Sequence, residues 1–491
     1  MVVSKRTRTP DKLTTPYIKR QPTVKAIWGA IFGLVLLGVS ACAPPELYDV
    51  VVRGGRAIDP DAGWDATRNI GIRSGQIVAI SNDRMVGDRE IDASGLIVSP
   101  GFIDLHAHGQ LEESYRVMVQ DGVTSGFELE VGTADVANWY SERRGGQIIN
   151  YGVSVGHIAA RMKVMGDDGE FLPSGPAISE PATLDQISMM KSLLEEGLRQ
   201  GAVAVGFGLA YTPAATSAEF ETMLRVVADH ETTAHIHVKG GPKGVQDAID
   251  GAEITGASLH VVHANSSGGA ETAEFLQKID QARSLGVDVT TEAYPYEAGM
   301  TRIESALFDD WETWDDDRFR IHQWAQTGER LSRRSFAHFR EQGGFVIIHD
   351  RTEEMTRTAI ESPLTMIASD GLIRGGRGHP RTSGTYAKVL GKFVREDGVL
   401  TLMEALGKMT IEPARRLQGY VPAMKTKGRL QVGADADITI FDADTVIDRS
   451  TYTEPTLPSH GIEYVLVNGV LVVEEGELVP DSRPGRPIRV R

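Results

Sequence analysis

The chain has 491 residues, 41% hydrophobic and 24% charged, which is the composition of a folded globular protein. The formal net charge of −16 argues against a nucleic-acid partner, because such proteins carry basic surfaces. The single cysteine excludes an internal disulfide. The length is sufficient for one large α/β barrel and a smaller domain, or for two or three ordinary domains.

The first 41 residues have the features of an export signal. Residues 1–25 hold seven basic residues and one acid, and an uncharged apolar run of 16 residues, Ala26–Ala41, follows. This run is short for a bilayer span and ends in small residues directly before Cys42. The segment resembles a bacterial lipoprotein signal. The resemblance implies that residues 1–41 are a signal peptide and that Cys42 is lipidated.

The same resemblance implies where the protein is found. We expect an exported lipoprotein, attached to a membrane through Cys42 and facing the periplasm. Ala43, rather than an aspartate, follows the cysteine, which favours the outer membrane. An ordinary signal peptide and an uncleaved anchor are the alternatives.

Short strands with alternating apolar residues are predicted near both ends of the chain. They cover Asp49–Arg53, Asn69–Arg73, Gln76–Ser81, Asp437–Phe441, Glu463–Asn468 and Val470–Glu474. The dipeptide Asn468-Gly469 is typical of a hairpin turn. Neither group of strands is large enough to form a domain alone. We therefore predict one small β-domain, built from residues 46–99 and 420–480 around a larger insert.

The insert, residues 100–419, alternates helix-period segments with short apolar runs. Helices are predicted at 184–200, from Ser217 onward, and at 272–285. Strand-like runs occur at 102–105, 122–130, 153–158, 202–207, 233–238, 259–262, 287–292, 345–348 and 364–369. These are nine runs, so one assignment is in excess of an eight-stranded barrel. Repeated βα units predict an α/β fold of the TIM-barrel type, with its chemistry at the C-terminal ends of the strands.

Histidines and carboxylates stand at the ends of these strands. His106 and His108 lie two residues apart, so their side chains project from the same face of one strand. The other candidates are Glu128, Glu130, His235, His237, His263 and Asp370. Taken alone, a histidine or acidic residue at the end of a strand is commonly a hydrogen-bonded polar residue without a catalytic or metal-binding role. Together, four histidines, a carboxylate and a terminal aspartate indicate a dinuclear metal site.

Several ordered motifs resemble those of the amidohydrolase superfamily, and within it the D-aminoacylase group. They are Pro100–Gly109, Gly156–Arg161, Gly206–Pro213, Ala293–Thr301, Ser369–Gly371 with His379–Arg381, and a C-terminal series from Lys408 to Arg486. The resemblance implies a (β/α)8 barrel, residues 100–419, with a β-sandwich made from both ends of the chain and an inserted subdomain around 300–362. It also implies metal ligands and a catalytic aspartate, which are His106, His108, His235, His263 and Asp370.

The sequence departs from this group at two places. It lacks the group's metal-binding cysteine in the segment Gly122–Gly132, and it lacks the lysine that other amidohydrolases carbamylate at 202–209. A glutamate could replace either one as a bridging ligand. We choose Glu130, which is nearer the end of the strand, and Glu128 on the same face is the alternative. In the substrate pocket, Asn265 replaces a carboxylate-binding lysine and His237 stands where the group has arginine.

The resemblance implies a metal-dependent amidohydrolase acting on carbon–nitrogen bonds other than peptide bonds, and first of all an N-acyl-D-amino-acid deacylase. Zinc, as one or two ions, is the expected cofactor because nitrogen-rich sites suit it. Asp370 is expected to act as general base and then as general acid. Tyr211, Tyr294 and Arg381 are candidate contacts to the small-molecule amide substrate, or else packing residues.

The sequence leaves two alternatives to a D-amino-acid deacylase open. One is an amidase or dipeptidase acting on an N-acyl-L-amino acid, a dipeptide or a cyclic amide. The other is a lipid-anchored binding protein that has lost catalysis. The full set of histidines with Asp370 argues against the second of these.

Overall fold

The computed structural model describes residues 47–490. The predicted signal peptide, residues 1–41, and Cys42 lie outside these residues, so export and lipidation stay predictions. Within residues 47–490, no helix is long and apolar enough to cross a membrane.

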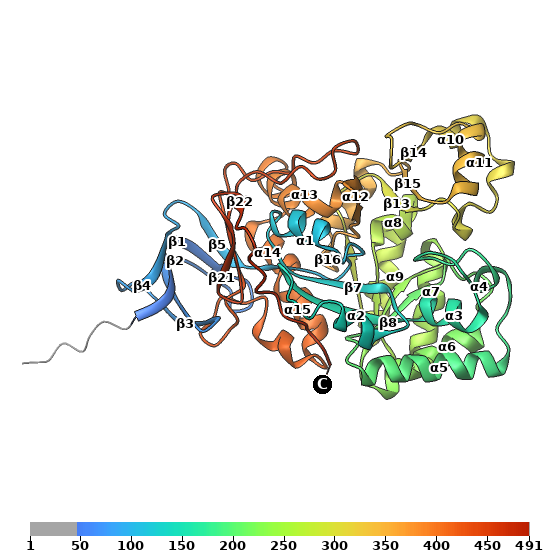
Figure 1. The fold of residues 1–491 in the computed structure, drawn as a ribbon, viewed down its shortest axis with the longest axis horizontal. Coiled ribbons are helices and arrows are strands. Elements are labelled where there is room, and N and C mark those ends of the chain that lie inside the picture. Colours follow the sequence, from blue (N-terminus) through green and yellow to red (C-terminus); the bar gives the residue numbers. More distant parts are fainter. Residues whose placement is uncertain (1–46, 491) are drawn as a thin grey trace, which may run out of the picture. The chain divides into compact units, whose positions relative to one another are not determined.

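Strands from both ends of the described chain join in one nine-stranded sheet, as the sequence predicts. Its order is β22-β21-β20-β19-β5-β1-β2-β3, with β4 paired to β1. The strands are β1 (Leu47–Asp59), β2 (Trp64–Arg73), β3 (Gln76–Ser81), β4 (Val86–Asp92), β5 (Ile97–Pro100), β19 (Ile438–Phe441), β20 (Ile462–Val467), β21 (Val470–Glu474) and β22 (Glu477–Leu478). The two halves of the sheet, from the N-terminal and C-terminal parts of the described chain, are blue and red in Figure 1. They meet where β5 pairs antiparallel with β19, which places Val98 opposite Ile440.

The turn between β20 and β21 shows why the sequence forms a hairpin there. Asn468 and Gly469 have φ angles of 48° and 78°. Positive φ at both central residues is what a two-residue hairpin turn requires, and asparagine and glycine accept it most readily. The apolar side chains of the sheet form a buried cluster that contains Val52 and Ile70 from one end and Ile438 and Leu466 from the other. The two ends therefore share one core.

Eight parallel strands form the barrel. Their order is β16-β12-β11-β10-β9-β8-β7-β6. They are β6 (Phe102–Asp104), β7 (Val123–Thr133), β8 (Asn150–Gly156), β9 (Val205–Gly208), β10 (Thr233–His237), β11 (Ser258–Val261), β12 (Val289–Ala293) and β16 (Thr365–Ile367). The first and last strands approach each other where Ala107 bridges to Gly371 and the Asp370 amide donates to the His106 carbonyl at 2.7 Å. The predicted (β/α)8 barrel is confirmed.

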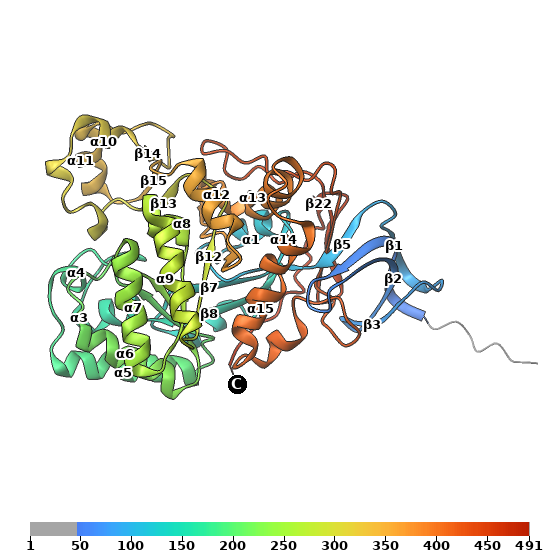
Figure 2. The ribbon, with the colours of Figure 1, turned by 180° about the vertical axis from the view of Figure 1, so that it is seen from behind.

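Helices follow the barrel strands. Those outside the insert are α1 (Glu112–Val119), α2 (Val136–Ser141), α3 (His157–Met165), α4 (Pro176–Ser179), α5 (Leu184–Arg199), α6 (Ser217–Asp229), α7 (Gly241–Thr255), α8 (Ala264–Gly268), α9 (Thr272–Ser284), α12 (Glu353–Glu361), α13 (Arg381–Lys388), α14 (Leu402–Met409) and α15 (Ile411–Gln418). Helix α5 begins with a capping box between Thr183 and Gln186. It buries Met190 and Leu194 in the main core, and Figure 2 shows it with α6, α7 and α9 outside the strands.

The apolar run at 345–348 is not a barrel strand, so this prediction is wrong. It forms β15 (Phe345–Ile348), which pairs antiparallel with β13 (Gly299–Arg302) and β14 (His322–Trp324). A four-residue apolar run looks the same in either kind of sheet, which is why its pattern could not decide. The insert (yellow in Figure 1) also holds α10 (Asp316–Arg320) and α11 (Arg333–Gln342). Its own buried aromatic cluster includes Phe308 and Trp314.

Candidate metal centre

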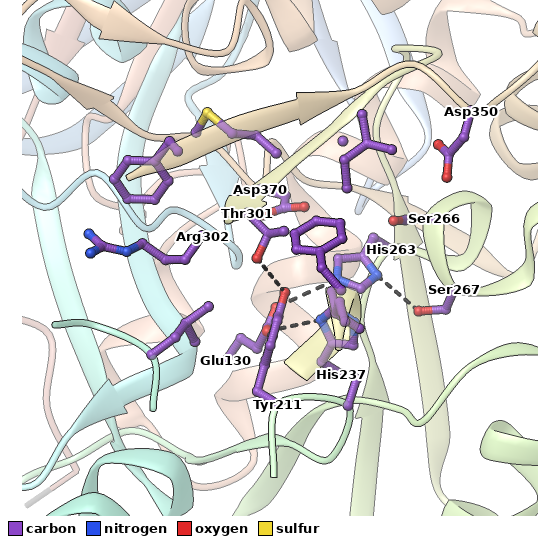
Figure 3. A pocket seen from close by; sticks show the side chains of 18 of the residues that line it. Glu130, Tyr211, His237, His263, Ser266, Ser267, Thr301, Arg302, Asp350 and Asp370 are labelled. Carbon is purple, nitrogen blue, oxygen red and sulfur yellow. Dashed lines mark hydrogen bonds and ion pairs between the residues drawn. The ribbon is translucent and has the colours of Figure 1, made fainter. Parts of the chain in front are cut away.

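Three groups of ligand atoms meet at the C-terminal ends of the barrel strands, and two of them include Glu130. These two are His106, His108 and Glu130, and Glu130, His237 and His263. The third group is His106, His263 and Asp370. Glu130 Oε2 lies 2.8 Å from His106 Nε2 and 3.6 Å from His263 Nε2. Glu130 Oε1 lies 3.1 Å from His237 Nδ1. Figure 3 shows His237 and His263 turned toward this carboxylate.

Asp370 follows β16, the last strand of the barrel, and faces the same cluster from there. Its Oδ1 lies 3.5 Å from His106 Nε2 and 3.2 Å from His108 Nε2, while Oδ2 lies 2.8 Å from Arg381 Nη1. Asp370 and His263 both have left-handed backbones, with φ of 52° and 37°. Such conformations cost roughly 1–3 kcal/mol in residues other than glycine and concentrate at functional sites. The barrel rim thus holds both side chains in strained, fixed positions.

The charges of the cluster depend on one another. Burial alone would raise the pKa of the Asp370 carboxyl, but Arg381 and His106 outweigh burial and hold that pKa well below its usual range. Burial lowers the pKa of His263 to about 4, with a further contribution from His237, so this imidazole is neutral at pH 7. Burial also disfavours the charged form of His108, yet Glu128 and Asp370 raise its pKa to about 10. A metal ion must therefore displace a proton from His108, which makes metal affinity dependent on pH.

The donor set fits zinc. Glu130 Oε2 is buried and has no partner with hydrogen-bond geometry among the described residues, although imidazole nitrogens surround it. His106 Nε2 and His108 Nε2 converge to 3.1 Å, with their rings at 88°. Converging imidazole nitrogens and carboxylate oxygens are ligands that zinc accepts. Because two of the three groups share Glu130, the residues fit one ion or two.

One predicted ligand needs correction, because the structure brings His237 rather than His235 into the cluster. Both ring nitrogens of His235 are buried without a hydrogen-bond partner among the described residues, and its ring packs 4.6 Å from that of His260. His235 lies one side-chain layer deeper in the barrel. The two histidines share a face of β10, so the alternation of the strand could not separate them. His237, which the sequence places in the substrate pocket, lies instead in a candidate ligand group.

We expect His237→Ala to weaken metal binding by more than about 100-fold, since outer-sphere partners alone are worth 10–100-fold. His235→Asn is the matched variant on the same strand, and it should bind metal as the unaltered protein does. Metal content per folded protein, measured after dialysis against a buffered zinc solution, distinguishes the two. Loss of metal from the His235 variant only would restore the assignment made from the sequence.

The two glutamates of β7 have different neighbours. Glu130 lies among the imidazoles, whereas Glu128 accepts a hydrogen bond from His108 Nδ1 at 2.7 Å and another from the Val131 amide at 3.0 Å. Glu128 thus orients His108 from behind. This is the arrangement in which a carboxylate fixes the tautomer of a metal-binding histidine.

Glu292, at the end of β12, is a site residue that the sequence reasoning missed. Its Oε1 accepts from His106 Nδ1 at 2.5 Å and its Oε2 accepts from His260 Nε2 at 2.9 Å. It therefore orients His106 as Glu128 orients His108. The signal that could have found it is the position of this carboxylate at the end of a predicted barrel strand.

Replacing Glu292 by glutamine should weaken metal binding by about 10–100-fold, the usual effect of losing a partner behind a ligating histidine. Glutamine keeps the size of the side chain but gives up its charge. Zinc affinity, measured by competition with a chelating dye, tests this. Unchanged affinity would show that Glu292 only fills the barrel interior.

The metal ligands open into a cavity of about 300 Å³ that lies between the barrel rim and the insert. Of the predicted substrate contacts, Tyr211 and Arg381 line it. The Tyr211 hydroxyl accepts from Thr301 at 3.2 Å, as Figure 3 shows. Tyr294 is buried below, with its ring 4.6 Å from the Arg381 guanidinium carbon. The side chains of Phe308 and Trp314 bring the insert into the cavity wall.

A (β/α)8 barrel with histidine and carboxylate ligands at its C-terminal rim defines a metal-dependent hydrolase. The family model described as "Amidohydrolase family" matches residues 180–473. The N-acyl-D-glutamate deacylase of Alcaligenes xylosoxydans xylosoxydans is 32% identical, over 90% of this chain and 97% of that protein. The chain belongs to the amidohydrolase family.

Further similarities lie within the D-aminoacylase group. The D-aminoacylase of Alcaligenes xylosoxydans xylosoxydans is 27% identical, over 87% of this chain and 95% of its own length. The crystal structure of N-acyl-D-glutamate deacylase from Bordetella bronchiseptica, complexed with zinc and a phosphonate inhibitor, has a TM-score of 0.78 and 29% identity. The similarity extends over 90% of this chain and 100% of that chain.

Proposed function

We propose that the protein is a zinc-dependent deacylase of N-acyl-D-amino acids. The observation that carries this proposal is Glu130, shared by two groups of histidine ligands beside Asp370. This site occurs in a chain with deacylase relatives along nearly its whole length. The reaction adds water across the amide bond, so that the acyl group leaves as a carboxylic acid and the amino acid as a free amine.

The residues of the chain support such a reaction. Bound zinc supplies Lewis acidity, which polarises a carbonyl group and makes water acidic near neutral pH. Asp370 Oδ1 is directed into the ligand cluster, where it takes the proton of the attacking water. It then passes this proton to the leaving nitrogen as the carbon–nitrogen bond breaks. Arg381 holds Oδ2 at 2.8 Å and keeps the carboxylate ionised before the reaction begins.

A panel of N-acetyl-D-amino acids, N-acetyl-L-amino acids, dipeptides and cyclic amides tests the proposal. We expect acetate release from D-substrates that stops when a chelator removes the metal and returns when zinc is added. Turnover of only L-substrates, dipeptides or cyclic amides would overturn the D-specific assignment. No turnover of any amide by zinc-loaded protein would leave a binding protein as the better description.

We also propose that the mature protein is a lipoprotein that begins at Cys42 and is anchored in a bacterial outer membrane, facing the periplasm. The support is the order of basic region, 16-residue apolar run and cysteine in the sequence. Replacing Cys42 by serine should abolish incorporation of labelled fatty acid and release the protein from the membrane fraction. Membrane attachment and processing that are identical in the variant would contradict lipidation.

A further inference from the structure

The cavity beside the metal ligands contains a buried guanidinium that the mechanism does not use. Arg351 follows β15 at the junction of insert and barrel, and its side chain is 7% exposed. It lines the cavity together with His263 and Asp370. Its guanidinium carbon lies 6.0 Å from the centre of the Tyr294 ring, the ring that Arg381 also covers. Arg351 is therefore next to the reactive part of the site.

The hydrogen bonds of Arg351 are incomplete. Nη2 donates to Ser266 Oγ at 2.6 Å, while Nε and Nη1 are buried without a hydrogen-bond partner among the described residues. Nη1 does lie 3.2 Å from Asp350 Oδ1, but this contact lacks hydrogen-bond geometry and the Asp350 side chain is 43% exposed. Buried donors without acceptors are costly, and arginine donors bind carboxylates strongly.

Each of the other arginines of the cavity lies close to a carboxylate. Arg302 Nε donates to Glu304 at 2.6 Å and Arg318 Nη1 donates to Asp310 at 3.3 Å. Arg381 Nε and Nη1 also lack a hydrogen-bond partner among the described residues, but Nη1 lies 2.8 Å from the buried Asp370 carboxylate. The neighbouring Asn265 is uncharged, and its amide nitrogen donates to the Tyr294 carbonyl at 2.9 Å. Among these groups, Arg351 is the buried cation with free donors whose nearest carboxylate, that of Asp350, is 43% exposed.

The structure also makes room for this guanidinium. Gly299, on β13, faces it so closely that a Cβ atom there would lie 2.9 Å from Nη1 and 3.0 Å from Nη2. Ser266 holds the guanidinium from the other side. Two elements, β13 and α8, thus fix the position of a side chain that comes from a third, the loop after β15.

We propose that Arg351, oriented by Ser266 and given space by Gly299, binds the free carboxylate of the substrate. This inference rests on the proposed deacylase function. It assigns the recognition of the amino-acid half to a residue of the loop that joins insert and barrel. The acyl amide then lies toward Asp370 and the metal ligands, while the carboxylate points to Arg351.

The test compares the best N-acetyl-D-amino acid of the panel with its carboxamide, in which a neutral amide replaces the carboxylate. Acetate release is measured for both. The unaltered enzyme should prefer the acid. In Arg351→Gln, kcat/KM for the acid should fall by about 30-fold or more, the effect of truncating one partner of a buried charge pair. For the carboxamide it should change by less than about threefold.

Two further variants make the result specific. Arg318→Gln removes a cation from the same cavity, but a half-exposed one on the insert, and should leave the preference for the acid intact. Gly299→Ala keeps every charge and displaces the guanidinium, so it should reduce the preference without altering zinc content.

Three results would overturn the inference. They are a parallel loss for acid and carboxamide in Arg351→Gln, no preference for the acid in the unaltered enzyme, and a loss of preference in Arg318→Gln equal to that in Arg351→Gln. A failure of the proposed function looks different, because zinc-loaded unaltered enzyme would then release acetate from neither compound.

Discussion

Replacing Asp370 by asparagine is expected to lower kcat by about 10²- to 10⁴-fold, the usual contribution of a positioned general acid–base group. Asparagine has nearly the same shape and keeps an oxygen that can face His106 and His108, but it cannot take up a proton. The zinc content should therefore stay close to that of the unaltered enzyme. Steady-state kinetics on the best N-acetyl-D-amino acid, with zinc measured in the same samples, check both expectations.

The variant also leaves the buried Arg381 without its carboxylate, which lies at 2.8 Å. Breaking a buried ion pair by removing one partner typically costs about 3–5 kcal/mol of stability. Thermal unfolding must therefore be recorded, and kinetics compared below the transition of the variant. A folded, zinc-loaded Asp370→Asn enzyme with kcat within tenfold of the original would assign the proton transfer to another group.

The fold could be predicted from the sequence because its signals are local. The pair His106 and His108 shares a strand face, and the Asn468-Gly469 turn has the residues that its φ angles require. The prediction of residues 345–348 as a barrel strand is wrong because the local pattern of this run is ambiguous. Four apolar residues fit both a barrel strand and the antiparallel sheet of the insert, and only pairing with β13 and β14 decides between them.

The site could be predicted to within one strand position. Glu128 and Glu130 share a face of β7, and nearness to the end of the strand favours Glu130. The same criterion applied to β10 selects His237, the histidine that the structure brings to Glu130. The family pattern favours His235 instead. Metal content of the variants at these two positions decides between the two criteria.

Other contacts of the site could not be found from the sequence. Glu292 and His106 are 186 positions apart, and Arg351 and Ser266 are 85 apart. Such pairs depend on how the barrel closes and on how the insert leaves and rejoins it. No periodicity or turn signal reports these long-range positions.

The remaining large effect is expected at Glu130. Because its carboxylate belongs to two of the three ligand groups, Glu130→Gln should weaken zinc binding by more than about 100-fold, beyond what the loss of an outer-sphere partner causes. Glu128→Gln is the matched variant, two residues away on the same strand. It keeps an oxygen that can accept from His108 Nδ1, so its loss should stay within about 10–100-fold.

Thermal unfolding gives a readout of the same difference without substrate. A ligand present at 100 times its Kd stabilises the folded state by about 2.7 kcal/mol, so chelation should lower the Tm of the unaltered enzyme. For a protein of this size each kcal/mol corresponds to about 2–4 °C or less. The Tm of Glu130→Gln should not respond to the chelator, whereas that of Glu128→Gln still should. Equal chelator responses in the two variants would mean that Glu130 is not the shared ligand.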